Sequence, residues 1–424
     1  MPRFIFFICD GSYNLTMKLF SFTAKYLPYC LPALLIFSRS LADIAVISIV
    51  ILFLAKCFIE KDFSWLHTSW IKAFLVFLVF LVFINSPLSL NPLDSFFYSI
   101  AWIRWPLFAI ALSYWIFSDK NSFNKLFFAI IVTFLFFISD LFFQFFIDDS
   151  GLLGLSGVPN PARLSVPLSN NVIPGRFIYM YSFIFLNIYV FRQLMLLKRI
   201  SAIYIFSILF LSFLAIFITG ERMSFLIFVS ASLIFLFTLI LFDKRRVTST
   251  LIFITSCSLA VFLFYLFNLE TFSRMIVSTG SKIAELATSD YGIVFFTSFE
   301  KFLNNPIFGS GLHQFQNTQP LYGTGIFQGT KILHGHNLPL NLMVETGLAG
   351  LLLFYNIIFF IFLDIKNKLQ KANPFFLILN LILLYICFFP LHTHFSLSHN
   401  WMNANIWFIV GLILALNNLV KNKT

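Results

Sequence analysis

Long apolar segments recur along the chain from Leu27 to Leu419, and they constrain the fold more than any other feature. A helix needs about 20 apolar residues to cross the hydrocarbon core of a bilayer, and these segments have that length. They lack the period-two alternation of a membrane barrel. Of the 424 residues, 59% are hydrophobic and only 11% are charged, whereas soluble domains carry about 25% charged residues. The sequence therefore predicts an all-α, polytopic membrane protein.

Twelve such segments predict twelve transmembrane helices. They cover residues 21–38, 42–59, 70–85, 96–118, 123–147, 176–196, 200–219, 223–242, 249–268, 338–363, 374–390 and 401–419. We expect an N-terminal membrane domain of about nine helices (1–268), a large periplasmic loop (269–337) and a C-terminal membrane domain of about three helices (338–424). Within the loop, apolar residues recur at helical spacing in the stretch 281–303, which predicts one further helix.

The basic residues predict an orientation. If both termini are cytoplasmic, 19 of the 28 lysines and arginines fall on the inner side and 9 on the outer side. The positive-inside rule favours this arrangement. The net charge of +11 then follows from topology and does not indicate nucleic-acid binding. The nine outer residues are Arg39, Arg104, Arg163, Arg176, Arg222, Arg274, Lys282, Lys301 and Lys331.

Arginines at the outer membrane boundary suggest a phosphate-bearing ligand, because a guanidinium binds phosphate oxygens through two parallel hydrogen bonds. Arg222 is the clearest case, since it lies in Thr-Gly-Glu-Arg-Met-Ser between two apolar segments with almost no loop. The alternatives are a surface pair with Glu221 or an interfacial arginine. Arg163 and Arg176 flank an earlier outer loop, and Arg274 opens the large one. Each of these three is also compatible with an ordinary loop charge.

Six histidines form two outer groups, namely His313, His334 and His336 in the large loop, and His392, His394 and His399 before the last apolar segment. A His-x-His pair can hold a metal ion, but no carboxylate or cysteine accompanies these histidines at a standard ligand spacing. We therefore expect no metal and no other cofactor. A neutral imidazole acting as a general base, or as a hydrogen-bond donor to a phosphate or a sugar hydroxyl, fits better.

His336-Asn337 is followed after nine residues by Gly347-Leu-Ala-Gly350, with Glu345 two residues before Gly347. This pattern resembles the signature of the O-antigen ligase and O-antigen polymerase superfamily of bacterial membrane proteins. Upstream, Asn305-Pro-Ile-Phe-Gly309-Ser-Gly311 is similar to the family's Pro-x-x-Gly-x-Gly turn. The stretch 219–222 is similar to the family's Thr-Gly-Ser-Arg, with glutamate in place of serine. Arg163-Leu-Ser resembles a weaker pattern in the earlier loop.

This resemblance implies a GT-C-like membrane protein of the bacterial inner membrane that acts in lipopolysaccharide biosynthesis. The implied reaction is a metal-independent, inverting glycosyl transfer from an undecaprenyl-diphosphate-linked glycan to lipid A core or to a second lipid-linked glycan. The implied catalytic residues are His336 at the acceptor hydroxyl, with Arg222 and Arg274 at the diphosphate. The implied substrate-binding residues are Arg163, Arg176, His334, Asn337, Glu345 and His313. Gly309, Gly311, Gly347 and Gly350 have implied structural roles in the turn and in helix packing.

The sequence departs from the family pattern in one place, because a second arginine is expected before the Pro-x-x-Gly-x-Gly turn, where Thr288-Ser-Asp-Tyr-Gly292 stands. Arg274, further upstream, is the candidate for that role. Ligase and polymerase activities both remain open, and the exact His-Asn-to-glycine spacing favours the ligase slightly. Two other classes remain as alternatives. One is a transporter or flippase, to which Asp140, Arg104 and residues 390–394 point. The other is a protein that binds lipid-linked glycan without catalysis.

Overall fold

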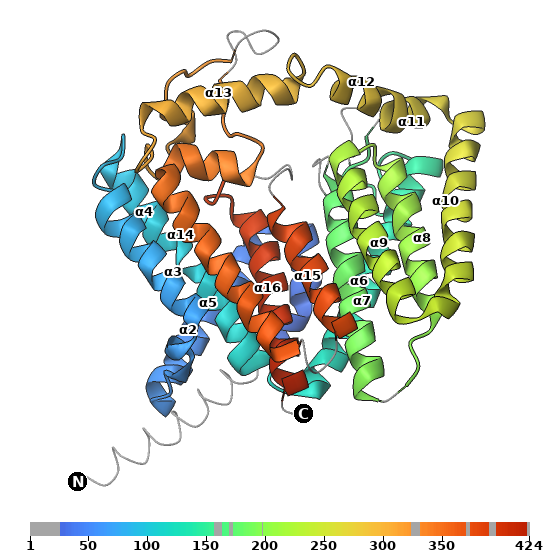
Figure 1. Cartoon of the computed structure of the whole chain (residues 1–424), viewed down its shortest axis with the longest axis horizontal. Helices are drawn as coiled ribbons and strands as arrows, with labels where there is room; N and C mark the ends of the chain where they lie inside the picture. The colour runs from blue at the N-terminus through green and yellow to red at the C-terminus, as the bar shows by residue number, and fades with distance from the viewer. Residues whose placement is uncertain are drawn as a thin grey trace.

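The computed structural model describes residues 26–156, 163–168, 173–196, 198–323, 331–369, 374–389 and 396–421. His392, His394 and the beginning of the predicted 21–38 segment lie outside these residues. The described part of the chain is a helical bundle, with a layer of short helices across one end (Figure 1). Its bridge between Tyr322 and Lys331 is an isolated antiparallel pair.

The bundle consists of the following helices. They are Tyr26–Phe37, α2 (Arg39–Glu60), α3 (Ser69–Phe80), α4 (Pro92–Trp102), α5 (Arg104–Ala111), α6 (Lys120–Phe146), α7 (Pro174–Met195), α8 (Ala202–Ile218), α9 (Arg222–Phe242), α10 (Val247–Phe267), α14 (Leu338–Leu369), α15 (Pro374–Phe388) and α16 (Asn400–Lys421). The π-helical turns Leu81–Asn85 (η2) and Leu112–Ile116 (η3) extend α3 and α5.

The protein is a polytopic membrane protein. Among the described residues, eight helices are long and apolar enough to cross a membrane. Four shorter apolar helices accompany them, namely Tyr26–Phe37, Ser69–Asn85, Ala202–Ile218 and Pro374–Phe388. Each of the twelve segments predicted from the sequence coincides with one of these twelve helices. The helices were located correctly because apolar length alone marks such segments, and eight of the twelve have the length and composition of a membrane span.

The helices differ in how much of their surface other helices cover. Residues of α7 and α16 are buried on almost every side, so these two helices form the centre of the bundle. In α10, by contrast, only Thr250, Phe253 and Ala260 are buried. An apolar helix with most of its surface uncovered faces lipid, which places α10 at the edge of the bundle.

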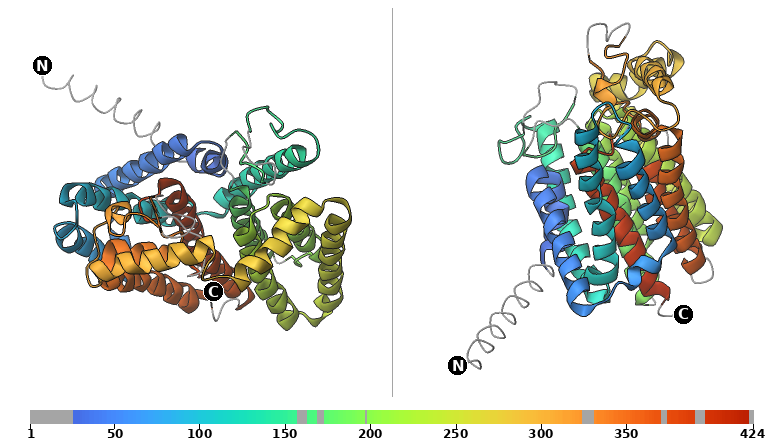
Figure 2. Two further views of the ribbon diagram at one scale, coloured as in Figure 1. Left: turned by 90° about the horizontal axis from the view of Figure 1, so that it is seen from above. Right: turned by 90° about the vertical axis from the view of Figure 1, so that its left-hand side faces the viewer.

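The segment between α10 and α14 forms a layer across one end of the bundle, and this end is called the outer end after the orientation predicted from the sequence. It contains α11 (Leu269–Phe272), the π-helical turn η5 (Ser273–Val277), α12 (Ser278–Ala284) and α13 (Asp290–Asn304). Seen from above and from the side, these helices lie across one end of the bundle (Figure 2).

The prediction of a single helix over residues 281–303 is wrong, because α12 ends at Ala284 and α13 begins only at Asp290. Ser289 begins a new helix by accepting a hydrogen bond from Gly292 N at 3.3 Å. At Gly292, a Cβ atom would lie 2.1 Å from Leu286 O, so only glycine fits this tight approach. The apolar periodicity hid this break, since serine and glycine act through capping and not through hydrophobicity.

Candidate functional site

The turn formed by residues 305–311, called the glycine turn below, packs against a kink in α14. Gly347 interrupts the helix with φ +65° and ψ −172°. Its backbone lies against the turn, and a Cβ at Gly347 would lie 2.3 Å from Ile307 O. Gly309 is the counterpart, because a Cβ there would lie 2.4 Å from Thr346 N. Gly347 thus allows a close backbone approach inside α14, whereas we expected it to serve packing at the start of that helix.

Four backbone hydrogen bonds fasten the turn to α14. Ser310 N donates to Val344 O and Gly311 N to Glu345 O, both at 2.9 Å. Leu348 N donates to Pro306 O at 2.9 Å, and Ala349 N donates to Ile307 O at 3.1 Å. The kink exposes helical groups that would otherwise bond within α14, and the turn satisfies them.

The other two predicted glycines also have close neighbours. A Cβ at Gly311, whose φ is +106°, would lie 2.1 Å from Ser89 Cβ. A Cβ at Gly350 would meet Thr346 within α14 and lie 3.0 Å from the ring of Phe80 in α3. Gly350 therefore lies where α14 packs closely on α3.

Sequence reasoning missed Asn85, which joins the turn to α14. Its side chain is fully buried at the outer end of η2. Asn85 Nδ2 donates to Phe308 O at 2.7 Å and to Glu345 O at 2.9 Å, while its Oδ1 accepts from Leu312 N at 3.2 Å. A lone amide at the end of an apolar segment was the only signal in the sequence.

Three histidines meet near Arg176 at the outer end of the bundle. The rings of His334 and His336 lie 4.0 Å apart, edge to face. His399 comes from the separate loop before α16, yet it is close enough to His334 to affect its pKa. Burial lowers the pKa of both His334 and His399 to about 4, and the charge of Arg176 lowers each further.

His336 is the accessible member of this cluster. Its side chain is exposed to solvent, although the protein surrounds it on its other sides, and this burial lowers its pKa. The positive charge of Arg176 lowers the pKa further. His336 also has a φ of +47°, which is uncommon for a non-glycine residue. The imidazole is therefore neutral near pH 7 and can accept a proton.

Asn337 helps to hold the loop that carries His334 and His336. Its Oδ1 accepts a hydrogen bond from Leu340 N at 3.1 Å and so caps α14. Its carbonyl oxygen accepts from Asn341 Nδ2 at 2.8 Å, and Asn341 Oδ1 accepts from Gly335 N at 2.9 Å. Through these contacts, Asn337 fixes the position of His336 just before the start of α14.

A chain of hydrogen bonds links Glu345 to His313. Glu345 is buried, and both of its carboxylate oxygens accept from Ser396 Oγ, at 2.8 and 3.1 Å. Ser398 Oγ donates to Ser396 Oγ at 3.0 Å and lies 3.1 Å from His313 Nδ1. The His313 ring stacks on Tyr98 at 3.8 Å. Glu345 and His313 thus hold the loop that carries His399.

A second cluster consists of three arginines from three segments. Arg222 begins α9 and donates to Ser278 Oγ at 2.8 Å, while Arg274 Nε in η5 donates to Gly220 O at 3.0 Å. Arg163 lies between α6 and α7. Burial lowers the pKa of Arg274, and the charges of Arg163 and Arg222 lower it further. Arg274 is therefore close enough to both Arg163 and Arg222 for their positive charges to act on it.

Glu221 is buried between α7 and α9. Its Oε1 accepts from Gly175 N and its Oε2 from Ser224 Oγ, both at 2.7 Å. In the described part of the chain, Glu221 and Arg222 form no ion pair, so a surface pair between them does not explain Arg222.

The same carboxyl group connects the two clusters. Burial raises the pKa of Glu221, whereas its hydrogen bond from Ser224 and the charges of Arg176 and Arg163 lower it. Arg176 belongs to the histidine cluster and Arg163 to the arginine cluster. Glu221 therefore lies near both, and the two clusters are neighbours at the outer end of the bundle.

Comparison with protein families gives one match. The model of the O-antigen ligase family matches residues 207–355. This segment carries an O-antigen ligase domain. It runs from α8 to the middle of α14 and contains Arg222, Arg274, the glycine turn and His336. A search of curated proteins finds no match. Members of the O-antigen ligase family are enzymes that transfer glycans as ligases or polymerases, and their substrates are lipid-linked.

The O-antigen ligase domain does not contain the whole site. Arg163 and Arg176 lie before residue 207, and His399 lies after residue 355. Among the described residues, no group of three or more histidine, cysteine, aspartate or glutamate side chains could hold a metal ion.

The residues that suggested a transporter have local partners in the structure. Asp140 accepts from Leu152 N at 2.7 Å and from Gln144 Nε2 at 2.6 Å, near the outer end of α6. Arg104 lies 3.3 Å from Asp43 Oδ1 and donates to Asn400 Oδ1 at 2.8 Å. Residues 390–394 lie outside the described part of the chain.

Proposed function

We propose that the protein transfers a glycan from an undecaprenyl-diphosphate carrier to an acceptor hydroxyl on the periplasmic side of the inner membrane, with lipid A core as the favoured acceptor. The O-antigen ligase domain supports the reaction class. One structural observation supports the site, namely that Arg274 lies close to Arg163 and Arg222 at the same end of the bundle as the accessible, neutral His336.

The arginine cluster fits the leaving group. The repulsion that Arg163 and Arg222 exert on Arg274 is unfavourable in the free protein, and a diphosphate would relieve it by binding between these groups. The negative charge on the diphosphate increases as the glycosidic bond breaks. Positive charges fixed beforehand stabilise that developing charge without reorganisation, which is the usual source of a large rate enhancement.

His336 fits the role of general base. The acceptor oxygen attacks the anomeric carbon of the donor, and a new C–O bond forms while the bond from that carbon to the diphosphate oxygen breaks. The proton of the acceptor hydroxyl passes to the neutral ring of His336. Attack on the face opposite the leaving group inverts the anomeric centre. The diphosphate departs with the electron pair, so the reaction needs no nucleotide and no metal.

The experiment compares surface glycans in a strain that lacks the gene and is complemented with wild type, Arg222→Ala or His336→Ala at matched expression. We expect each variant to lose transfer, because the removal of one charge-stabilising donor costs about 10²–10³ in rate. Arg245→Ala is the matched control. Arg245 follows the opposite end of α9, is exposed and pairs with Asp243 at 2.9 Å.

The glycan profile of the strain without the protein distinguishes the acceptors. Full-length glycan that stays on the carrier and is absent from lipid A core indicates a ligase. A single repeat unit on the core indicates a polymerase. An unchanged profile, or a loss of transfer in Arg245→Ala equal to that in Arg222→Ala, contradicts the proposal.

A further inference from the structure

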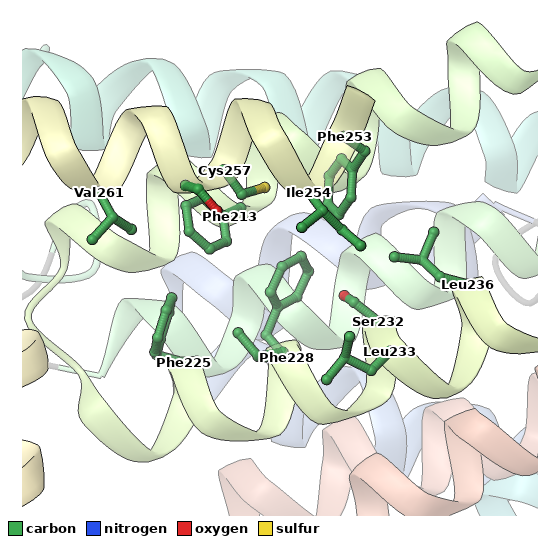
Figure 3. Close-up of a pocket in the computed structure, with 12 residues that line it drawn as sticks. Phe213, Phe225, Phe228, Ser232, Leu233, Leu236, Phe253, Ile254, Cys257 and Val261 are labelled. Atoms are coloured by element: carbon green, nitrogen blue, oxygen red, sulfur yellow. The ribbon is translucent and has the colours of Figure 1, made fainter. Parts of the chain in front are cut away.

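An apolar cavity of about 400 Å³ lies between α8, α9 and α10 (Figure 3). Its size is within the range of about 300–1,000 Å³ that is usual for small-molecule sites. The lining is almost entirely apolar, and Phe228 and Leu233 of α9 face Phe253 and Ile254 of α10 across it. Ser232 and Ser258 are the exceptions, and the hydroxyl of Ser232 is buried without a hydrogen-bond partner.

The cavity is open toward the membrane. Leu233 and Ile254, which line it from α9 and α10, are 54% and 44% exposed. The two helices are consecutive in the chain and joined by the short turn Lys244–Arg246, yet the cavity separates them along their middle. Because α10 is otherwise weakly covered by the protein, a long apolar molecule in the bilayer could enter between the two helices.

The outer end of the cavity leads to the arginine cluster. Phe225 lines the cavity, and Arg222 lies three residues earlier, one turn closer to the outer end of α9. Residues three apart on a helix share a face. Beyond the outer end of α10, the chain continues through α11 into η5, which carries Arg274. Arg222 thus continues the lining of the cavity along α9, and Arg274 lies in the segment that follows α10.

We propose that this cavity binds the isoprenoid chain of the lipid-linked donor, in the segment nearest its diphosphate. The assignment rests on the proposed function. It follows from the order of the arginine cluster and the apolar cavity, because a polyprenyl diphosphate has an anionic group followed directly by an apolar chain. The occupant enters sideways from the membrane between α9 and α10, and its diphosphate reaches Arg222 and Arg274.

A second cavity provides the contrast. It has a volume of about 300 Å³ and lies between α8 and α10 toward their inner ends, with Ser207 and Ser256 in its lining. The arginine that follows α9 on that side, Arg246, lies 3.2 Å from Asp243 and donates to Ile200 O. At this inner cavity the nearby arginine is paired with a carboxylate, whereas at the outer end Arg274 lies close to two further arginines.

The test fills each cavity with a large side chain in the full-length protein. Ser232→Trp occupies the proposed site, and Ser207→Trp is the matched control in the inner cavity. Transfer is measured in detergent with two donors that carry the same glycan, one on a long polyprenyl diphosphate and one on a short, water-soluble prenyl diphosphate. We expect Ser232→Trp to raise KM for the long-chain donor by about tenfold or more, since even one methylene group changes discrimination about tenfold.

The same variant keeps the wild-type KM for the short-chain donor, and Ser207→Trp keeps it for both donors. If Ser232→Trp leaves KM for the long-chain donor unchanged, the cavity does not hold the chain. An equal loss with both donors also contradicts the proposal, because it reflects a general effect on the site. If the wild-type protein transfers neither glycan, the proposed function itself fails, and that result differs from each of these.

A binding measurement on the wild-type protein does not depend on any variant folding. Cys257 lines the cavity, whereas Cys30 is exposed elsewhere in the chain. Long-chain polyprenyl diphosphate should slow maleimide labelling of Cys257 and leave labelling of Cys30 unchanged, as quantified by peptide mass spectrometry. Equal protection of Cys257 by a phospholipid at the same concentration would mean that the cavity takes any lipid chain, which would overturn the assignment.

Discussion

Replacement of Asn85 by leucine should detach the glycine turn from α14. Asn85 makes three hydrogen bonds that join η2 to Phe308, Leu312 and Glu345, over distances of 2.7, 3.2 and 2.9 Å. Each hydrogen bond contributes about 1 kcal/mol net, and a buried group left without a partner costs about 1–3 kcal/mol. Leu312 is fully buried, so its N–H cannot turn to water. The free energy of unfolding should therefore fall by about 3 kcal/mol.

The matched control is Asn187→Leu, the same change at an equally buried amide. Asn187 lies in the middle of α7, and its hydrogen bond to Asn380 Oδ1 is long, at 3.4 Å. Its own Oδ1 is buried without a hydrogen bond, so leucine removes a group that is already unsatisfied. We expect a cost of about 1 kcal/mol or less for this variant.

Both variants are compared with wild type by denaturant titration in mixed micelles, followed by tryptophan fluorescence, and glycan transfer is measured under native conditions. Asn85→Leu should lose stability and transfer together, because the turn supports the helix that begins beside His336. A loss of stability no greater than that of Asn187→Leu would refute the reasoning, since it would mean that the backbone hydrogen bonds alone hold the turn.

The remaining predictions concern the site and the topology. Because burial and Arg176 lower the pKa of His336, the acid limb of kcat/KM against pH should lie below the ordinary value of 6.5, and a limb at or above 6.5 would exclude His336 as the base. Gly347→Ala should cost about 1–3 kcal/mol of stability from its backbone conformation alone, whereas Gly280→Ala, exposed in α12 with no atom within 4 Å, should be neutral or stabilise by up to about 1 kcal/mol. Chelators should leave transfer intact, and restoration of lost activity by a divalent ion would contradict this. A reporter fused after Lys421 should be cytoplasmic and one inserted near residue 323 periplasmic, and the reverse pattern would overturn the orientation.

The sequence predicted the helices well because apolar length is a local property. Each apolar segment carries its own signal, and no knowledge of its neighbours is needed to recognise it. The family motifs likewise marked His336, the glycine turn and Arg222, and the structure brings these motifs to one end of the bundle. The helix break before Ser289 was missed, because a cap and a tight glycine contact do not alter the apolar pattern.

Residues that act over long sequence separations were not predictable in this way. Asn85 contacts partners more than 200 positions away, and nothing in its own segment indicates them. The loop carrying His399 is held by Ser396 and Ser398, two small polar residues with no motif of their own. Their roles depend on the buried Glu345 carboxylate, which only the folded chain brings within reach. A buried polar group must find a partner, but the sequence does not say which one.

At the outer end of the bundle, the arginine side chains are charged and the histidine side chains are neutral. Arginine keeps its charge in almost any surroundings, whereas histidine gives up its proton when it is buried or when a cation lies nearby. Arg176 therefore helps to keep His334, His336 and His399 neutral, as their lowered pKa values indicate. One part of the site thus stays cationic and the other stays able to accept a proton. A diphosphate bound among the arginines would offset the positive charge that lowers the pKa of His336. Donor binding would then make this histidine a stronger base at the step where an acceptor hydroxyl must lose its proton.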